Sequence, residues 1–262
     1  MKVTILGCGG SAGVPMIGGR DGRGDWGACN PKEARNRRTR ASVLVEQDGK
    51  RLLIDTSPDM REQLMAQAVP RVDAIVWTHA HADHVMGLDD IRILNRIANA
   101  SMPVFATAET FSELQRRFDY AFTPWTGPGY FRPVLEPVEV AAGETVTMAG
   151  MDARLIDQDH GFSRTLGIRI GGFAYSTDFV RLDEAAIAAL AGLDTWVVDC
   201  FQRGEHRTHC WFERTLEMIA AVKPRRAVLS HMGPDLDWDW LVRKLPAGAE
   251  PGHDGMSLEI AG

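Results

Sequence analysis

Three histidines and one aspartate fall within the six-residue segment His79-Ala80-His81-Ala82-Asp83-His84. The preceding residues, 72–77, are apolar and β-branched, which is typical of a buried strand, so this segment opens as a loop at a strand end. His79 and His81 are two residues apart and share one face of extended backbone. Imidazole and carboxylate ligands suit zinc, manganese or iron(II), and the lack of cysteine here argues against a purely structural zinc site. The segment holds more ligands than one open site needs, and we therefore expect two metal ions.

The pattern His-x-His-x-Asp-His after an apolar strand resembles the signature of the metallo-β-lactamase superfamily. The Gly-rich stretch from Gly7 to Pro15 and the tail from His253 to Met256 resemble the branch of that superfamily that hydrolyses phosphodiesters, including the cyclic phosphodiesterases of phosphonate breakdown. The resemblance runs from Gly7 to Met256 and implies further ligands at the ends of later strands. The residues at those places are His160, Asp178 and His231.

The resemblance implies two divalent metal ions, zinc or manganese, in one dinuclear centre. One ion is expected on His79, His81 and His160, the other on Asp83, His84 and His231, and Asp178 is expected between them. Two metals about 3.5–4 Å apart share a water and lower its pKa towards ~7, which supplies a bridging hydroxide as nucleophile. Asp83 is also expected to hold this nucleophile by a hydrogen bond.

The resembled branch has a Thr-His or Asn-His pair whose histidine is no ligand but lies near the leaving group. Two histidines of the segment Glu205-His206-Arg207-Thr208-His209-Cys210 compete for that place. His209 matches it better and is expected to protonate the leaving alkoxide. His206 is expected to lie at the surface.

The arginine-rich run from Arg35 to Arg40 allows two interpretations. It is either a solvated surface or a guanidinium fork for a substrate phosphate, for which Arg38 and Arg40 are the candidates. Asp55 likewise has two interpretations, because it ends the strand over 51–54. It either caps that strand or orients a ligand histidine by a hydrogen bond.

Two further stretches qualify the resemblance. Backbone N–H groups of residues 7–13 could cradle a phosphate, but Pro15 and Gly18-Gly19 prevent the helix that follows a dinucleotide-binding turn, so we expect a tight structural loop. Relatives in this branch bind a structural metal through several cysteines and a histidine. This chain offers only Cys29, and Pro234 stands where the histidine would be, so no structural metal is expected.

The composition is that of a globular protein in which 45% of the 262 residues are hydrophobic and 24% are charged. Net charge is −6, from 29 basic and 35 acidic residues, which does not favour nucleic acid as a partner. No apolar run approaches the ~18 residues of a membrane span. Four cysteines do not resemble a disulfide framework, and we expect a cytoplasmic protein. The protein could form a homodimer, but the sequence does not predict its oligomeric state.

Alternating strand and helix patterns predict an α/β fold formed by residues 1–262 as a single domain. Helices are expected over 58–68, 85–100, 108–120, 182–190 and 211–222. Two strand-rich halves with helices suit a four-layer αββα sandwich, in which two mixed β-sheets pack face to face and helices cover the outer faces. The aromatic, proline-rich segment over 122–132 is interpreted as packing between layers or as a lid over the substrate.

The function expected from these residues is a dinuclear metal-dependent hydrolase that cleaves small, cyclic phosphodiesters. Three alternatives use the same residues differently: a lactone or thioester hydrolase, a tRNA 3′-processing ribonuclease, and a non-catalytic ligand-binding relative in cofactor biosynthesis. The ribonucleases carry a long basic arm that this chain lacks.

Overall fold

Two seven-stranded sheets form the centre of the computed structural model, which describes residues 1–260. The strands of the first sheet lie in the order β14 (Met256–Glu259), β1 (Lys2–Gly7), β2 (Ser42–Gln47), β3 (Lys50–Ile54), β4 (Ala74–Val76), β5 (Met102–Ala106) and β6 (Leu135–Glu139). Those of the second lie in the order β13 (Ala249–Pro251), β12 (Arg226–Ser230), β11 (Thr195–Asp199), β10 (Phe173–Ser176), β9 (Arg164–Ile170), β8 (Met151–Asp159) and β7 (Thr145–Met148). Both sheets are mixed, which confirms the predicted sandwich.

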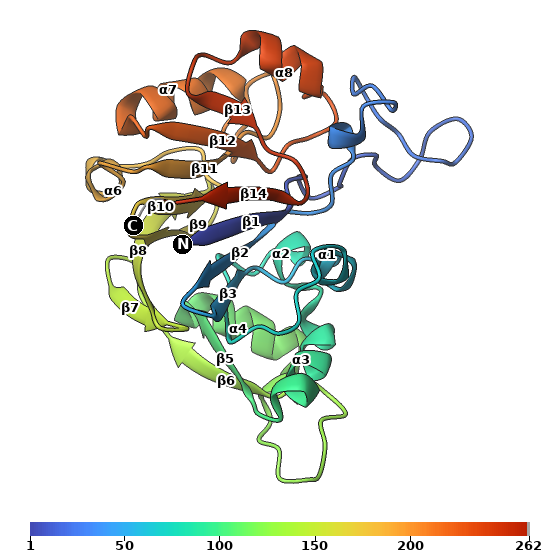
Figure 1. Ribbon diagram of the computed structural model, residues 1–262, viewed down its shortest axis with the longest axis vertical. Helices are drawn as coiled ribbons and strands as arrows, with labels where there is room; N and C mark the ends of the chain where they lie inside the picture. The colour runs from blue at the N-terminus through green and yellow to red at the C-terminus, as the bar shows by residue number, and fades with distance from the viewer. Residues whose placement is uncertain (261–262) are drawn as a thin grey trace.

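Helices lie beyond both sheets (Figure 1). Those that follow strands of the first sheet are α1 (Met60–Ala66), α2 (Ala82–Val85), η2 (Leu88–Asp90), α3 (Ile91–Ala98), α4 (Ala108–Arg117) and α5 (Asp119–Phe122). Those that follow strands of the second are α6 (Glu184–Ala189), α7 (Phe212–Val222) and α8 (Trp238–Lys244), and a short turn, η1 (Ala34–Asn36), precedes β2. Within residues 1–260, no helix combines the length and apolar composition needed to cross a membrane.

Strand β2 shows why these residues form a layered structure. Val43 and Val45 belong to the core between the two sheets, whereas Leu44 belongs to a second core between the first sheet and its helices. Successive side chains of a strand point to opposite faces, so an unbroken apolar run is buried on both sides. Buried apolar area is the main source of folding stability, at about 25 cal/mol per Å².

Parallel pairing brings the candidate site residues to one edge. In the first sheet, β3 pairs with β4 in parallel and Ile54 lies opposite Val76, so Asp55 and the loop after Val76 leave their strands side by side. In the second sheet β10, β11 and β12 are parallel, and Asp199 lies opposite Ser230. The carboxyl ends of parallel strands share an edge, where open α/β sheets hold their sites.

The single helix predicted over 85–100 is wrong, because this stretch forms α2, η2 and α3. Gly87 explains the interruption, since its N–H donates to the Thr56 carbonyl at 3.0 Å. A β-carbon at Gly87 would lie 2.2 Å from the Ser57 carbonyl oxygen, so the chain passes close to the preceding loop here. Asn99 then ends α3 in a left-handed conformation, with φ of 50°.

Candidate metal centre

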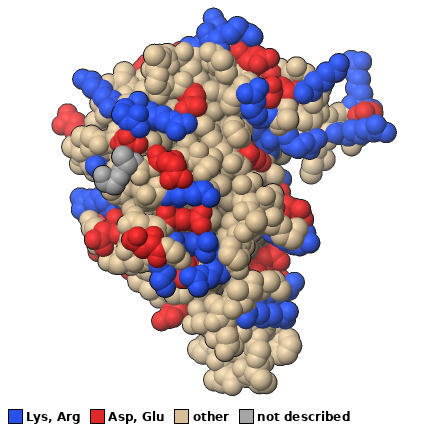
Figure 2. Space-filling view, viewed as in Figure 1, with Lys and Arg blue, Asp and Glu red and all other residues tan. Residues whose placement is uncertain are grey.

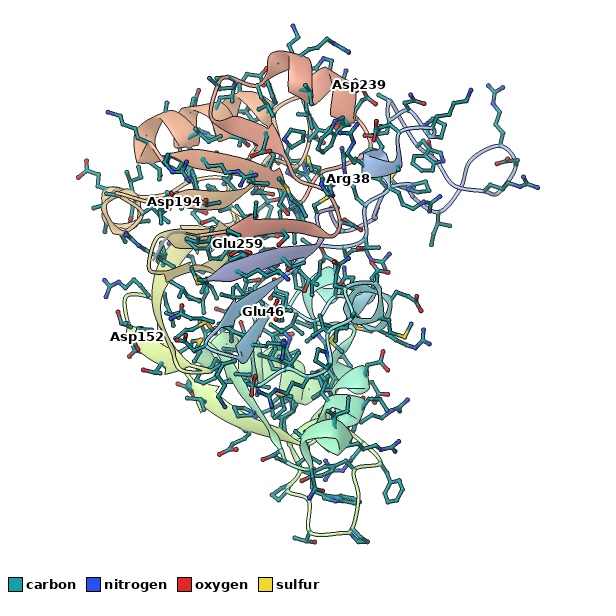
Figure 3. The ribbon with its side chains drawn as sticks, viewed as in Figure 1. Arg38, Glu46, Asp152, Asp194, Asp239 and Glu259 are labelled. Carbon is teal, nitrogen blue, oxygen red and sulfur yellow. The ribbon has the colours of Figure 1, made fainter. Side chains whose placement is uncertain are left out.

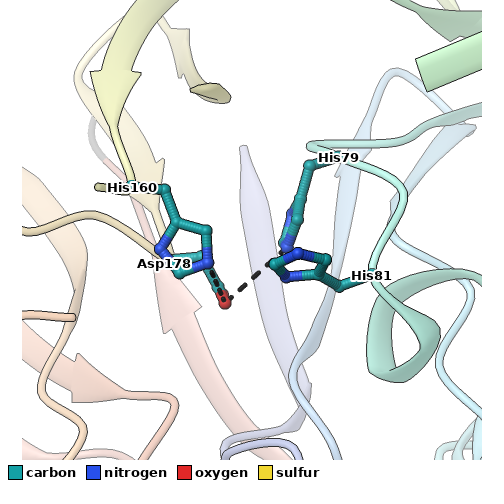
Figure 4. A group of neighbouring side chains, drawn as sticks. All are labelled: His79, His81, His160 and Asp178. Atoms are coloured by element: carbon teal, nitrogen blue, oxygen red, sulfur yellow. Dashed lines mark ion pairs between the residues drawn. The ribbon is translucent and has the colours of Figure 1, made fainter. Parts of the chain in front are cut away.

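Seven side chains converge at the shared edge of the two sheets. The donor atoms of His79, His81, His160 and Asp178 lie within 4.8 Å of one another, and so do those of Asp83, His84, Asp178 and His231. Figure 4 shows the first group, whose histidines approach Asp178 from two sides. The structure therefore brings together all seven residues that the sequence singled out as metal ligands.

Asp178 belongs to both groups and presents a different oxygen to each. Its Oδ1 lies 3.7 Å from His79 Nε2 and 3.8 Å from His160 Nε2. Its Oδ2 lies 3.1 Å from His84 Nε2 and 3.4 Å from His231 Nε2. This carboxylate therefore lies between the two sets of imidazoles.

The ring orientations fit metal ligation. His84 Nδ1 donates to Asp55 Oδ2 at 2.7 Å, and His79 Nδ1 donates to the Thr78 hydroxyl at 3.0 Å. The Nε2 atoms of His79 and His84 are buried, and among the described residues neither has an aligned hydrogen-bond partner. A buried nitrogen without a partner is costly, whereas an imidazole held through one nitrogen presents the lone pair of the other to a metal. The donor set therefore fits divalent cations of the zinc and manganese class.

Electrostatics at the site also fits cations. Burial alone would raise the pKa of Asp178, but the imidazoles of His231 and His84 hold it well below its usual value. Burial alone would lower the pKa of His231, but Asp178 and Asp199 raise it to about 10. The carboxylates thus create a strongly negative potential in a buried place, which bound cations would neutralise.

Asp55 orients the loop that carries the first histidines. Besides contacting His84, it accepts the Thr78 N–H at 2.8 Å and the Thr78 hydroxyl at 2.9 Å. Burial raises the pKa of this carboxyl, although His84 and Thr78 oppose the shift. Of the two interpretations of Asp55, the structure shows the hydrogen bond to a candidate ligand histidine.

His209 lies beside the two groups. Its Nδ1 is 3.8 Å from Asp178 Oδ1 and 3.4 Å from Asp199 Oδ2, and its ring stacks on His231 with centroids 5.0 Å apart. Asp199 also faces His231, whose Nδ1 is 3.4 Å from Asp199 Oδ1. Asp199 was not among the site residues predicted from the sequence. Its position directly at the end of a predicted apolar strand, like that of Asp178, was the available signal.

A cavity of about 350 Å³ opens over these residues. It is lined by Ser11, His81, Asp83, His160, Phe162, Ser163, Asp178, Thr208, His209 and His231. No residue of the aromatic segment 122–132 lines it; instead Trp125 and Phe131 contact each other, with centroids 6.1 Å apart. The lid interpretation of that segment is therefore not supported.

The predicted guanidinium fork needs correction. Arg38 is 2% exposed and donates to the carbonyls of Gly233 at 3.1 Å and Leu236 at 2.7 Å, beside the long loop over residues 16–34 (Figure 3). Arg40 pairs with Asp59, with Nε and Oδ2 3.0 Å apart. Neither guanidinium lines the cavity, because each is committed to a protein partner. Sequence alone could not distinguish a structural arginine from one that binds substrate.

The Gly-rich stretch is a tight structural loop, as expected. Gly9 N donates to the Thr39 carbonyl at 2.7 Å, and Gly10 N donates to the Met232 carbonyl at 3.1 Å. These N–H groups are therefore not free for a phosphate. Asp254 stabilises the loop, because its carboxylate accepts the Cys8 N–H at 3.0 Å and the Thr39 N–H at 2.7 Å.

Cys29 is buried and its neighbour Ala28 donates to the Pro234 carbonyl at 2.9 Å. Within residues 1–260, Cys29 belongs to no group of candidate metal ligands.

Comparison with known proteins identifies related chains. The family model described as "Beta-lactamase superfamily domain" matches residues 50–232. Octanoyltransferase of Porphyromonas gingivalis is 30% identical over 264 residues, which cover 99% of this chain and 52% of that protein. The chain thus spans about half the length of this curated relative. Coenzyme PQQ synthesis protein B of Methylorubrum populi is 34% identical over 234 residues, which cover 76% of this chain and 72% of that protein.

Two solved structures are similar to this chain over nearly its whole length. The crystal structure of a diphosphatase from the PhnP family is 35% identical, has a TM-score of 0.89, and covers 99% of this chain and 98% of its own. Zinc-bound PqqB from Methylobacterium extorquens, at 23% identity, has a TM-score of 0.77 and covers 99% of this chain and 100% of its own, which shows a shared fold.

Proposed function

The chain belongs to the metallo-β-lactamase superfamily, in its PhnP-like branch, and is a metal-dependent hydrolase; from that premise we propose that it hydrolyses small phosphodiesters at two divalent metal ions. The observation that carries the proposal is that Asp178 turns one oxygen to each of two donor sets. His79, His81 and His160 would hold one ion, and Asp83, His84 and His231 the other.

When bound, such ions would supply a water whose pKa falls from 15.7 to roughly 7 and would draw charge from the phosphoryl oxygens. Asp83, which lines the cavity, would orient that water by accepting its hydrogen bond. His209, on the same cavity wall, would give a proton to the leaving oxygen. Asp199 faces His209 and would stabilise the imidazolium that donates it.

A small substrate is favoured over nucleic acid. The cavity of about 350 Å³ accommodates a compact diester. On the face drawn in Figure 2, basic and acidic side chains lie interspersed among other residues, and the net charge is −6. A surface of that kind does not provide the continuous basic field that binds a nucleic-acid backbone.

A second candidate substrate class is diphosphates. It is favoured because the similar PhnP-family structure, at 35% identity, is described as a diphosphatase. In both classes hydrolysis cleaves a bond from phosphorus to a bridging oxygen, and the phosphorus carries anionic oxygens that two cations would bind. The residues assigned above would act in the same way on either class.

The test is a substrate panel on protein stripped of metal and reloaded with zinc or manganese. We expect turnover of bis-nitrophenyl phosphate and of cyclic nucleotides, loss of turnover on adding a chelator, and a large loss in Asp178→Asn. Asp152→Asn, on an exposed carboxylate, is the matched control. Inorganic diphosphate, a lactone and an acyl thioester complete the panel. Turnover only on diphosphate would select the second class; turnover only on lactone or thioester, or none with metals bound, would overturn phosphoester hydrolysis.

A further inference from the structure

His206, which the sequence predicts to lie at the surface, is a partly buried histidine to which the proposed reaction gives no role. Its Nδ1 is 3.3 Å from the backbone N–H of Thr208 and 3.2 Å from that of His209, and both donate to it. An acceptor that receives the N–H groups two and three residues later imitates the turn that an Asn or Asp side chain makes. His206 thus fixes the peptide that carries His209.

Packing holds the same ring in place. The His206 ring lies 4.9 Å from that of Phe201 and 5.1 Å from that of His209, measured between centroids. Phe201 in turn stacks on His209, with centroids 4.5 Å apart and planes inclined by 22°. Burial lowers the pKa of His206, which favours the neutral ring that such an acceptor requires.

The fixed peptide also reaches the metal centre. The Thr208 carbonyl accepts the Nδ1–H of His160 at 2.7 Å, which leaves the His160 Nε2 lone pair facing the first donor group. The loop and the β8–β9 turn pack closely, because a β-carbon on Gly161 would lie 2.9 Å from Thr208 Cγ2. Little room is left for the loop to shift in this direction.

We propose that His206 is a positioning residue, whose ring nitrogen holds the Thr208–His209 peptide so that His209 faces the leaving group; this rests on the proposed phosphoester hydrolysis. His206 touches no reacting atom. An asparagine places its Oδ1 where His206 has Nδ1, so Asn preserves the acceptor. A phenylalanine keeps the ring and removes the acceptor. The pair His206→Asn and His206→Phe therefore separates hydrogen bonding from packing.

The first readout needs no turnover. Amide hydrogen exchange of Thr208 and His209 is followed by NMR in the metal-loaded protein. We expect both amides to exchange at least tenfold faster in His206→Phe and at close to the wild-type rate in His206→Asn. Arg207→Gln, on the exposed neighbour, is the control and should change neither. Two results would overturn the proposal: unchanged exchange rates in His206→Phe, or exchange in His206→Asn that is as fast as in His206→Phe.

The second readout is the dependence on the leaving group. In His206→Phe, kcat on a cyclic nucleotide should fall roughly tenfold, part of the ~100-fold or more that a general acid supplies. On bis-nitrophenyl phosphate, whose leaving group needs no proton, kcat should fall less than twofold, and KM should not change on either. In His206→Asn, kcat on both esters should be close to the wild-type value. An equal fall in kcat on the two esters would contradict the positioning role of His206.

The two readouts separate the two proposals. If the wild-type protein turns over neither ester, phosphoester hydrolysis fails, and the exchange rates still decide whether His206 holds this peptide. If His206→Phe does not fold, His206→Gln, which keeps an acceptor but displaces it by one carbon, takes its place in both measurements.

Discussion

Asp178 is the residue on which the geometry of the candidate site depends. It is 2% exposed, and five imidazole nitrogens lie between 3.1 and 3.8 Å from its two oxygens. A buried carboxylate is retained only where positive charge compensates it. The imidazoles of His79, His84 and His160 are held through Nδ1 and present Nε2 towards the site, where bound divalent cations would compensate the carboxylate.

His209 offers the sharpest test of the proposed proton transfer. In His209→Ala, kcat on a cyclic nucleotide should fall by roughly 10²–10⁴, the usual contribution of a general acid. Bis-nitrophenyl phosphate should be affected little, because nitrophenolate leaves without a proton. Steady-state kinetics on both esters checks this. An equal fall on both would assign His209 a different role.

Asp55 should control metal affinity without being a ligand. Removing the carboxylate partner of a ligand histidine typically costs 10–100-fold in affinity, because the ring loses its orientation and basicity. We therefore expect Asp55→Asn to weaken metal binding by that factor, measured by competition with a chromophoric chelator. Asp48→Asn, in the exposed hairpin turn, should bind as the wild type does. Unchanged affinity in Asp55→Asn would contradict the role.

Individual residues differ in whether their role in the site can be predicted from the sequence. Ligands that share one short loop, such as His79 and His81, are visible because their spacing is fixed by local backbone. Asp199 was missed because a single acidic residue after a strand has no spacing partner in the sequence. Arg38 was one of two candidates for substrate binding, but its guanidinium donates to two buried carbonyls instead. Long side chains can reach several places, and only packing decides between them.

At the scale of elements, three strand ends share an unusual backbone. Asp55, Asp178 and His231 follow β3, β10 and β12 and have φ of 64°, 54° and 57°. A residue other than glycine in this region costs about 1–3 kcal/mol, and such residues cluster at functional sites. The left-handed turn ends each strand abruptly, so that the side chain stays at the shared edge. The sequence predicted the strand ends but not this conformation, which is uncommon for residues other than glycine.

Arg38 should matter for stability rather than for substrate. Arg38→Met keeps much of the volume but removes the donor to the Leu236 carbonyl and one of the two donors to the Gly233 carbonyl, and a buried acceptor that loses its partner costs about 1–3 kcal/mol. We expect the free energy of unfolding in urea to fall by about 2–4 kcal/mol, with KM on bis-nitrophenyl phosphate within twofold of the wild type. A large rise in KM at unchanged stability would restore the substrate role.

Helix α8 provides a pH-dependent prediction. Its N-cap, Asp237, accepts the N–H groups of Trp240 and Asn30, each at 3.1 Å, and an Asn36 side-chain N–H at 2.8 Å. Burial alone would raise the pKa of Asp237, but these bonds lower it below its usual value. A lowered carboxyl pKa stabilises the fold above the unfolded-state pKa, and this stability is lost as pH falls through the folded-state pKa.

Asp237→Ala should therefore lower the free energy of unfolding by about 1–2 kcal/mol at pH 7, as expected for the loss of an N-cap. The difference from wild type should shrink below about pH 4, where the carboxyl becomes protonated. Urea titrations at pH 7 and pH 3 measure it. A difference that stays constant over this range would mean that the charge of Asp237 contributes nothing.

At the scale of the molecule, the site is shared between two similar halves. Each sheet has three antiparallel pairings and three parallel ones, and the residues that follow β4, β10 and β12, which belong to parallel pairs, meet at the candidate site. The loop from His79 to His84 comes from the first sheet, whereas His160, Asp178 and His231 come from the second. The layered fold follows from strand patterns in the sequence. The meeting of these loops depends on sheet packing across long sequence distances, which local patterns do not encode.

Metal binding should therefore stabilise the whole molecule, because the donor sets exist only when both sheets are packed. A ligand that binds only the native state at 100 times its Kd adds about 2.7 kcal/mol, and 1 kcal/mol raises the Tm of a chain of this size by about 2–4 °C. We expect stripped protein to melt roughly 5–10 °C lower for each ion removed, and titration with zinc or manganese to restore the Tm after two equivalents. In Asp178→Asn, the rise in Tm on adding metal should be mostly lost. Saturation after one equivalent would contradict the dinuclear centre, and a Tm indifferent to chelator would contradict both sites.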